Sequence, residues 1–307
     1  MNRFMSRFFL LLAASLLLPL AAHAQAFRTY VASYGVSTNP CTVSQPCRLV
    51  SEALPNTLDG GEIWILDSAN FNSGTLTINK SVSIMAVPGQ IGSIVSVGGA
   101  PAISIATASA KVRLRNLFIV DNANNHGTDG INVSASGVTL TVESCVMWVI
   151  GDAVVVNGSS STLTFVNNRV LGGTNGVRVR GGAAAEIVKS DFANVTSYGV
   201  WVDASIPSTS STATVRDSTF NRMYIGLLAW SQSAGASARL YATGTSVTNA
   251  SYGLMNEQDA GAATSTAGGN AFGNVNYALT NVSGTLQSFG NNMSNGNYGT
   301  ITAVPQS

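Results

Sequence analysis

Short runs of apolar residues alternate with small or polar turns along this chain, in a repeat of roughly 24 residues that extends from about Ala102 to the C-terminus. One aliphatic position recurs at spacings of 23–28 residues, and a Gly or Ala stands directly before it. The aliphatic positions are Ile103, Ile131, Val154, Val177, Val200, Leu227, Leu254 and Leu279. A repeat of this size predicts a solenoid, in which each coil buries its apolar face by stacking on its neighbours.

A second register places a bulky residue two positions after a polar one in each copy. The bulky residues are Phe118, Val146, Val170, Phe192, Phe220, Val247, Phe272 and Met293. The polar residues are Asn116, Ser144, Asn168, Ser190, Ser218, Thr245, Asn270 and Asn291. Asn, Ser and Thr bond backbone groups at bends, so this column predicts the same bend in every coil.

The composition of the repeats selects the kind of solenoid. The copies are rich in Val, Thr, Ser, Asn and Gly and alternate with a period of two, which indicates strands rather than helices. The consensus of leucine-rich repeats and the Gly-Gly-x-Gly-x-Asp repeat of calcium-binding β-rolls are both absent from the sequence. The prediction is an all-β, parallel β-helix.

The N-terminus has the pattern of an export signal. Residues 1–24 contain Arg3 and Arg7, an apolar run and Ala22-His23-Ala24, which predicts cleavage after Ala24. The remaining chain divides into an N-terminal cap with the first coils (25–100), the β-helix repeats (101–290) and a C-terminal cap (291–307). No later stretch is apolar enough to span a bilayer, so we expect a secreted or periplasmic bacterial protein without membrane insertion.

Charge is scarce and balanced in the exported chain. Without Arg3 and Arg7 it has 13 basic and 14 acidic residues. Such a balance offers no electrostatic basis for binding nucleic acid or an anionic membrane.

Two of the three cysteines lie in one short prolyl loop. Cys41 and Cys47 are six positions apart, and an oxidising compartment favours a local disulfide between them. Cys145 lies beside the predicted polar column, where we expect a packed, unreactive thiol.

The N-terminal segments are similar to a known family. Residues 48–54 (RLVSEAL), 60–66 (GGEIWIL) and 76–84 (LTINKSVSI) resemble the start of pectin-lyase-like right-handed β-helices. From Phe27 onward the chain also resembles secreted bacterial right-handed parallel β-helix repeat proteins that begin with an Asn-Pro-Cys and Pro-Cys loop. The resemblance implies a right-handed coil with a short N-terminal capping helix. It implies little about function, since most of that group has no established activity.

Catalytic motifs of two enzyme families on this fold are incomplete here. The paired aspartates and the Arg-x-Lys of polygalacturonase-like hydrolases are missing from the sequence. The Trp-x-Asp-His segment of pectate lyases is approached by Trp201 and Asp203, but Ala204 stands where histidine is expected.

The register predicts one candidate site on an outward face. Outward neighbours of the aliphatic column form two rows, because side chains alternate along a strand and coils stack about 4.8 Å apart. The rows are Asn132, Val155, Arg178, Trp201, Leu228 and Met255, and Ser134, Asn157, Arg180, Asp203, Trp230 and Glu257.

Three interpretations of this face remain open. Arg178, Arg180, Trp201 and Trp230 suit a polysaccharide or cell-surface glycan, which stacks on aromatic rings and hydrogen-bonds to charged groups. Asp203 and Glu257, roughly 10 Å apart by the stacking distance, are candidate catalytic groups of a polysaccharide lyase or glycoside hydrolase acting on an acidic glycan. Stacked ion pairs and aromatics also occur on purely structural faces.

Two smaller features suggest further ligands or partners. Asp129 and Asp152 occupy one register in adjacent coils and are candidate Ca²⁺ ligands, although Asp before Gly is also ordinary turn chemistry. The outward apolar residues Val155, Leu228 and Met255 suit a homo-oligomer interface. We expect an exported protein that binds a polysaccharide or a cell-surface partner along this face, with a lyase or hydrolase and a structural or adhesive surface protein as alternatives.

Overall fold

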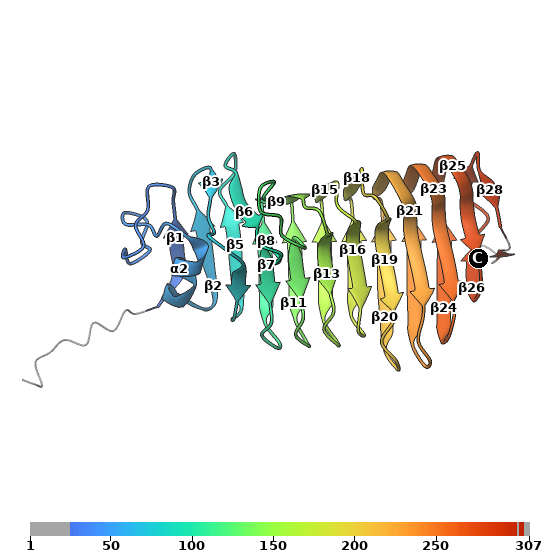
Figure 1. Ribbon diagram of the computed structural model, residues 1–307, viewed down its shortest axis with the longest axis horizontal. Coiled ribbons are helices and arrows are strands. Elements are labelled where there is room, and N and C mark those ends of the chain that lie inside the picture. The colour runs from blue at the N-terminus through green and yellow to red at the C-terminus, as the bar shows by residue number, and fades with distance from the viewer. Residues whose placement is uncertain (1–24, 300, 304–307) are drawn as a thin grey trace, which may run out of the picture.

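The computed structural model describes residues 25–299 and 301–303 and has one short helix followed by a stack of β-coils. Figure 1 shows the coils following one another along a single axis, from the N-terminal helix to the C-terminal strands. Residues 1–24, with the predicted signal and cleavage position, lie outside the described residues. The architecture is the predicted all-β, right-handed parallel β-helix.

One side of the coil is a parallel sheet of 12 strands. In spatial order its strands are β1 (Ala26–Val31), β2 (Thr57–Ile65), β5 (Val82–Ala86), β8 (Lys111–Arg115), β11 (Thr139–Glu143), β14 (Thr162–Val166), β17 (Ala184–Val188), β20 (Ser210–Arg216), β22 (Ser237–Thr243), β24 (Ala262–Gly268), β26 (Thr285–Ser288) and β29 (Thr302–Ala303). Each strand pairs with the strand of the next coil, which is the pairing that a solenoid requires.

The other sides form a sheet of 17 strands. In chain order they are β3 (Ala69–Asn70), β4 (Leu76–Ile78), β6 (Gly92–Ser96), β7 (Ile103–Ile105), β9 (Leu117–Asp121), β10 (Ile131–Val133), β12 (Val146–Trp148), β13 (Asp152–Val156), β15 (Arg169–Leu171), β16 (Asn175–Arg180), β18 (Asp191–Ala193), β19 (Tyr198–Ala204), β21 (Thr219–Ser231), β23 (Ser246–Gln258), β25 (Ala271–Asn281), β27 (Met293–Ser294) and β28 (Asn297–Tyr298). From β21 onward one long strand takes the place of two short ones, since β21 pairs with both β18 and β19.

The first predicted register is confirmed. Its aliphatic residues pair from coil to coil, from Ile103 with Ile131 to Leu254 with Leu279. Both residues of each of these two pairs have no exposed surface. The aliphatic column therefore lies in the core of the coil. The outward residues next to it in each strand also pair from coil to coil, as the sequence predicts.

The second register is confirmed in the middle of the chain and wrong by one residue near its ends. Val170 pairs with Met147 rather than Val146, and Phe272 pairs with Ser294 rather than Met293. Met147 in turn pairs with Ile119, so Phe118 also faces outward from the core column. The column of bends therefore passes through Leu117, Cys145 and Asn292 instead of Asn116, Ser144 and Asn291.

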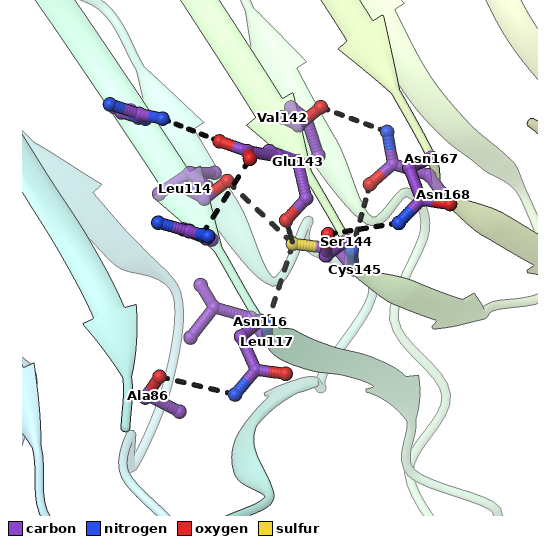
Figure 2. Close-up of polar contacts among 12 residues, drawn as sticks. Ala86, Leu114, Asn116, Leu117, Val142, Glu143, Ser144, Cys145, Asn167 and Asn168 are labelled. Atoms are coloured by element: carbon purple, nitrogen blue, oxygen red, sulfur yellow. Dashed lines mark hydrogen bonds and ion pairs between the residues drawn. The ribbon is translucent and has the colours of Figure 1, made fainter. Parts of the chain in front are cut away.

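The buried polar column fixes the bend by hydrogen bonds between coils. Asn168 Oδ1 accepts the backbone N–H of Cys145 at 2.8 Å, and Asn168 Nδ2 donates to the carbonyl of Val142 at 2.9 Å (Figure 2). The residue before the column is left-handed in several coils, as at Ser144 with φ 53° and Asn167 with φ 55°. Side chains thus satisfy backbone groups that the bend removes from the sheet ladder.

Cys145 occupies one position of this column. Its Sγ accepts the backbone N–H of Leu117 at 3.4 Å and lies 3.4 Å from the carbonyl of Glu143 (Figure 2). Burial raises the pKa of the Cys145 thiol to about 12. The thiol is therefore a packing and hydrogen-bonding group, not a nucleophile.

The N-terminal end of the coil is covered by the helix α2 (Val50–Asn56), close to the predicted position. Val50, Ala53 and Leu54 are buried, and the helix packs against β1, β2 and β4. The predicted disulfide between Cys41 and Cys47 is confirmed. Within residues 25–299 and 301–303, no helix has the length and apolar character needed to cross a bilayer.

Candidate functional site

The two outward rows lie side by side on β16, β19, β21 and β23, as the register predicts. Arg178 pairs with Trp201, Trp201 with Leu228, and Leu228 with Met255. The second row runs from Arg180 through Asp203 and Trp230 to Glu257. We call the part formed by Arg178, Arg180, Trp201, Asp203 and Trp230 the lateral face.

A buried carboxylate holds the two arginines of the lateral face. Asp203 has no exposed surface, although it points away from the core column. Its Oδ2 accepts hydrogen bonds from Arg178 Nε at 2.9 Å and Nη2 at 2.6 Å, and lies 3.6 Å from Arg180 Nε. Its Oδ1 accepts the backbone N–H of Ser205 at 3.1 Å. Both arginine side chains remain about a quarter exposed, at 25% and 26%.

The aromatic rings continue the same stack. The Arg178 guanidinium lies 4.1 Å from the centroid of the Trp201 ring, and Trp230 stacks on Trp201 with centroids 6.3 Å apart. Tyr198 meets Trp201 edge to face at 5.1 Å. Arg178 and Trp230 come from the coils on either side of β19, so they approach Trp201 from opposite sides. Trp201 therefore presents mainly its edge, whereas Trp230 is the last ring of the stack.

Acidic groups border Trp230. Its Nε1 donates to Asp259 Oδ2 at 2.9 Å, a residue that we did not single out from the sequence, although it follows Glu257 by two positions. Glu257 is partly buried, and burial followed by the charge of Asp259 raises the pKa of its carboxyl. No hydrogen bond or ion pair joins Glu257 to Asp203 in the described part of the chain.

Two N–H groups of the lateral face are buried without a hydrogen bond, although Arg180 Nε lies 3.6 Å from Asp203 Oδ2. Trp201 Nε1 and Arg180 Nε make no hydrogen bond in the described structure. A buried polar group without a partner is costly, at about 1–3 kcal/mol. Both atoms are covered by protein, so they are a local cost of packing on this face and not groups that a ligand can reach.

Asp129 and Asp152 form a separate ladder beside this face. Asp129 Oδ1 accepts the backbone N–H of Asp152 at 3.0 Å, and Asp152 Oδ1 accepts Asn175 Nδ2 at 2.6 Å. Burial raises the pKa of Asp152, and the charge of Asp129 adds to the rise, against the hydrogen bond from Asn175 and the charge of Arg178. The described residues include no group of three or more His, Cys, Asp or Glu placed to hold a metal. The two aspartates are engaged in coil-to-coil hydrogen bonds, and Ca²⁺ binding by them stays a prediction.

The outward apolar residues do not form an exposed strip. Val155 is 8% exposed and Leu228 is 1% exposed. Only Met255 of the three is partly accessible. A homo-oligomer interface at this position therefore lacks the exposed surface on which the prediction rested.

Comparisons with known proteins agree with the fold. A pectate lyase, Pel9A, is 14% identical with a TM-score of 0.66, and the match covers 92% of this chain and 79% of that protein. An alginate lyase from Paenibacillus sp. str. FPU-7 is 15% identical with a TM-score of 0.51, covering 81% and 98%. XylC in complex with xylose is 7% identical with a TM-score of 0.55, covering 85% and 69%. At these identities the likeness concerns the fold alone.

The sequence itself also matches a family description. No curated protein matches the chain. The model of the right-handed β-helix region matches residues 101–275, which is more than half of the chain and includes the whole lateral face. The chain belongs to the right-handed β-helix family.

Proposed function

We propose that this protein binds a polysaccharide along the lateral face. The observation that carries the proposal is the stack of Arg178, Trp201 and Trp230, fixed from below by buried Asp203. Such fixation lowers the entropy lost on binding, because the side chains are already ordered.

The charges around the lateral face favour hydrogen bonds from its arginines to a glycan over ion pairs with an acidic glycan. The two arginines lie among two carboxylates, since Arg178 Nη1 is also 3.9 Å from Asp152 Oδ2. Asp259 and Glu257 add negative charge beside Trp230. We therefore infer that the arginines bind sugar hydroxyl groups, and that acidic glycans gain little from them.

Cleavage by a lyase or hydrolase is the second candidate. Burial, followed by the charge of Asp259, raises the pKa of the Glu257 carboxyl, which is the direction that favours a general acid. Its proposed companion Asp203 is buried under two arginines, so a glycosidic bond cannot approach it without displacing them. This burial favours binding over catalysis.

A glycan array tests the proposal, with neutral and acidic polysaccharides and three proteins. Wild type should bind at least one polymer, and Trp230→Ala should weaken that binding by more than about tenfold, as the loss of a central aromatic contact does. The matched control is Trp64→Ala, because Arg28 lies over Trp64 at 4.2 Å in the same kind of pair, on β1 and β2.

Each outcome separates the candidates. Binding by wild type and Trp64→Ala but not by Trp230→Ala supports the lateral face. New reducing ends or unsaturated products with a bound polymer would establish cleavage and make Glu257→Gln the next variant. No binding to any polymer would refute the proposal and favour a structural or adhesive role.

Export belongs to the same proposal. The Cys41–Cys47 disulfide supports it, since such bonds persist in oxidising compartments. N-terminal sequencing of the exported protein should begin at Gln25, and a chain that retains residues 1–24 in the cytoplasm would contradict it.

A further inference from the structure

A cavity that shares no residue with the lateral face lies beside the ends of β9 and β12. Its volume is about 290 Å³, and five of its seven lining residues are apolar. The two polar ones are Asp121 and His126. Two of the apolar ones are unusually accessible, since Trp148 is 61% exposed and Ile150 is 47% exposed.

The histidine of this cavity is held in a defined orientation. His126 Nδ1 lies 2.5 Å from Asp121 Oδ2. Asp121 Oδ1 accepts the backbone N–H of Gly127 at 2.8 Å and the Ser96 hydroxyl at 3.1 Å. Partial burial raises the pKa of Asp121, but the hydrogen bonds from His126, Gly127 and Ser96 outweigh it and leave the pKa lowered. Because Nδ1 faces the carboxylate, Nε2 is the ring nitrogen left for a ligand, and in a neutral imidazole it accepts a hydrogen bond.

The indole of Trp148 is supported from the next coil. Gly172, in that coil, has no side chain, and a Cβ there would lie 3.3 Å from Trp148 Cδ1 and 3.4 Å from its Nε1. The backbone of Gly172 therefore approaches the indole closely. One part of the Trp148 ring thus packs against the Gly172 backbone, although most of the ring is accessible.

We propose that this cavity binds an uncharged phenolic ring, whose hydroxyl donates to His126 Nε2 while the ring packs against Trp148 and Ile150. A cavity of about 150 Å³ accommodates benzene, so the larger volume here suits one substituted ring. A sugar would place several hydroxyls against Val, Ala and Ile side chains, while only Asp121 and His126 of the seven lining residues have polar side chains. An anion would meet the Asp121 carboxylate, and no Lys or Arg lines the cavity.

The test uses p-cresol as the probe, with protein-detected NMR titration of the tryptophan indole signals. The reference ligand is 4-methylanisole, which keeps the ring and the oxygen but cannot donate a hydrogen bond. Wild type should bind p-cresol saturably and about fivefold to tenfold more tightly than the ether, the effect of one hydrogen bond in a partly buried site. His126→Phe should remove this preference, and Trp148→Ala should weaken both ligands.

The controls separate this site from the lateral face. Trp230→Ala should leave p-cresol binding unchanged, so failure of the polysaccharide proposal does not affect this one. N-acetyl-tyrosinamide carries the same phenol on a peptide unit, and its binding with the same His126 dependence would identify a tyrosine of a partner protein as the source, whereas binding of p-cresol alone would indicate a free phenol. Equal affinity for p-cresol and its ether, tighter binding of methyl glucoside, or no shift of the Trp148 signal would overturn the assignment.

Discussion

The replacement Asp203→Asn removes the charge that holds the arginines of the lateral face and keeps the shape of the side chain. Its Oδ1 can still accept the backbone N–H of Ser205, but the amide brings N–H groups against the donors of Arg178. Breaking a buried ion pair costs about 3–5 kcal/mol. Asp203 is fully buried but the arginine side chains are about a quarter exposed, so we expect the lower end, about 3 kcal/mol.

The chain contains a matched control on the opposite sheet. Glu143 also pairs with two arginines, Arg113 at 2.5 Å and Arg115 at 3.7 Å. Here the arginine side chains are 49% exposed and the carboxylate is 25% exposed. Solvent screens such a pair, so Glu143→Gln should cost less than about 1 kcal/mol.

The assay is urea unfolding followed by circular dichroism, with the free energy of unfolding compared at equal slope. A double-mutant cycle with Arg178→Met isolates the Asp203–Arg178 term, which we expect at about 2 kcal/mol because both side chains are in direct contact. A loss below about 0.5 kcal/mol for Asp203→Asn, or a loss equal to that of Glu143→Gln, would refute the view that this carboxylate organises the face.

Three further predictions concern the core and the bends. Gly253→Val should lower the free energy of unfolding by about 2 kcal/mol or more through overpacking, since even a Cβ would lie 2.3 Å from the Phe272 ring; an unchanged Tm would contradict this. The Cys145 thiol should resist a disulfide reagent at pH 8 in the native state and react in urea, because burial raises its pKa to about 12; rapid native reaction would show an accessible thiol. Asp152→Asn should stabilise the protein near neutral pH. Burial raises the pKa of Asp152, so the wild type loses stability as the pH rises through that raised value, and the advantage of the variant should vanish below about pH 4. Equal stability of both proteins at all pH values would count against the burial of this charge.

The fold and the alignment of the lateral face could be predicted because the aliphatic column keeps the same register from coil to coil. With Val177, Val200 and Leu227 inward, the alternation of side chains places Arg178, Trp201 and Leu228 in one outward row. The family resemblance added the handedness and the capping helix.

The second register could not be read with the same certainty, for a physical reason. Around Phe118 and Met147 apolar residues occupy neighbouring positions, so either one of two adjacent side chains could face the core. Hydrophobicity alone does not decide between them. The hydrogen bonds of the Asn168 side chain do, and they are visible only in the structure.

The burial of Asp203 was also beyond the sequence. Alternation places Asp203 outward, and outward usually means exposed. Its burial arises from Arg178 and Arg180, which come from the preceding coil and close over it. The burial of Leu228 was likewise not predictable from alternation, because Leu228 is outward in the sequence pattern but only 1% exposed.

Oxidative footprinting with mass spectrometry measures directly whether a polysaccharide lies on the lateral face. The protein is exposed to hydroxyl radicals with and without the polymer selected by the array, and the oxidation of each tryptophan is measured. The polymer should protect Trp230 and leave Trp64 and Trp148 oxidised as before. Protection of Trp64 or Trp148 with no change at Trp230 would place the ligand elsewhere on the coil and refute binding at the lateral face.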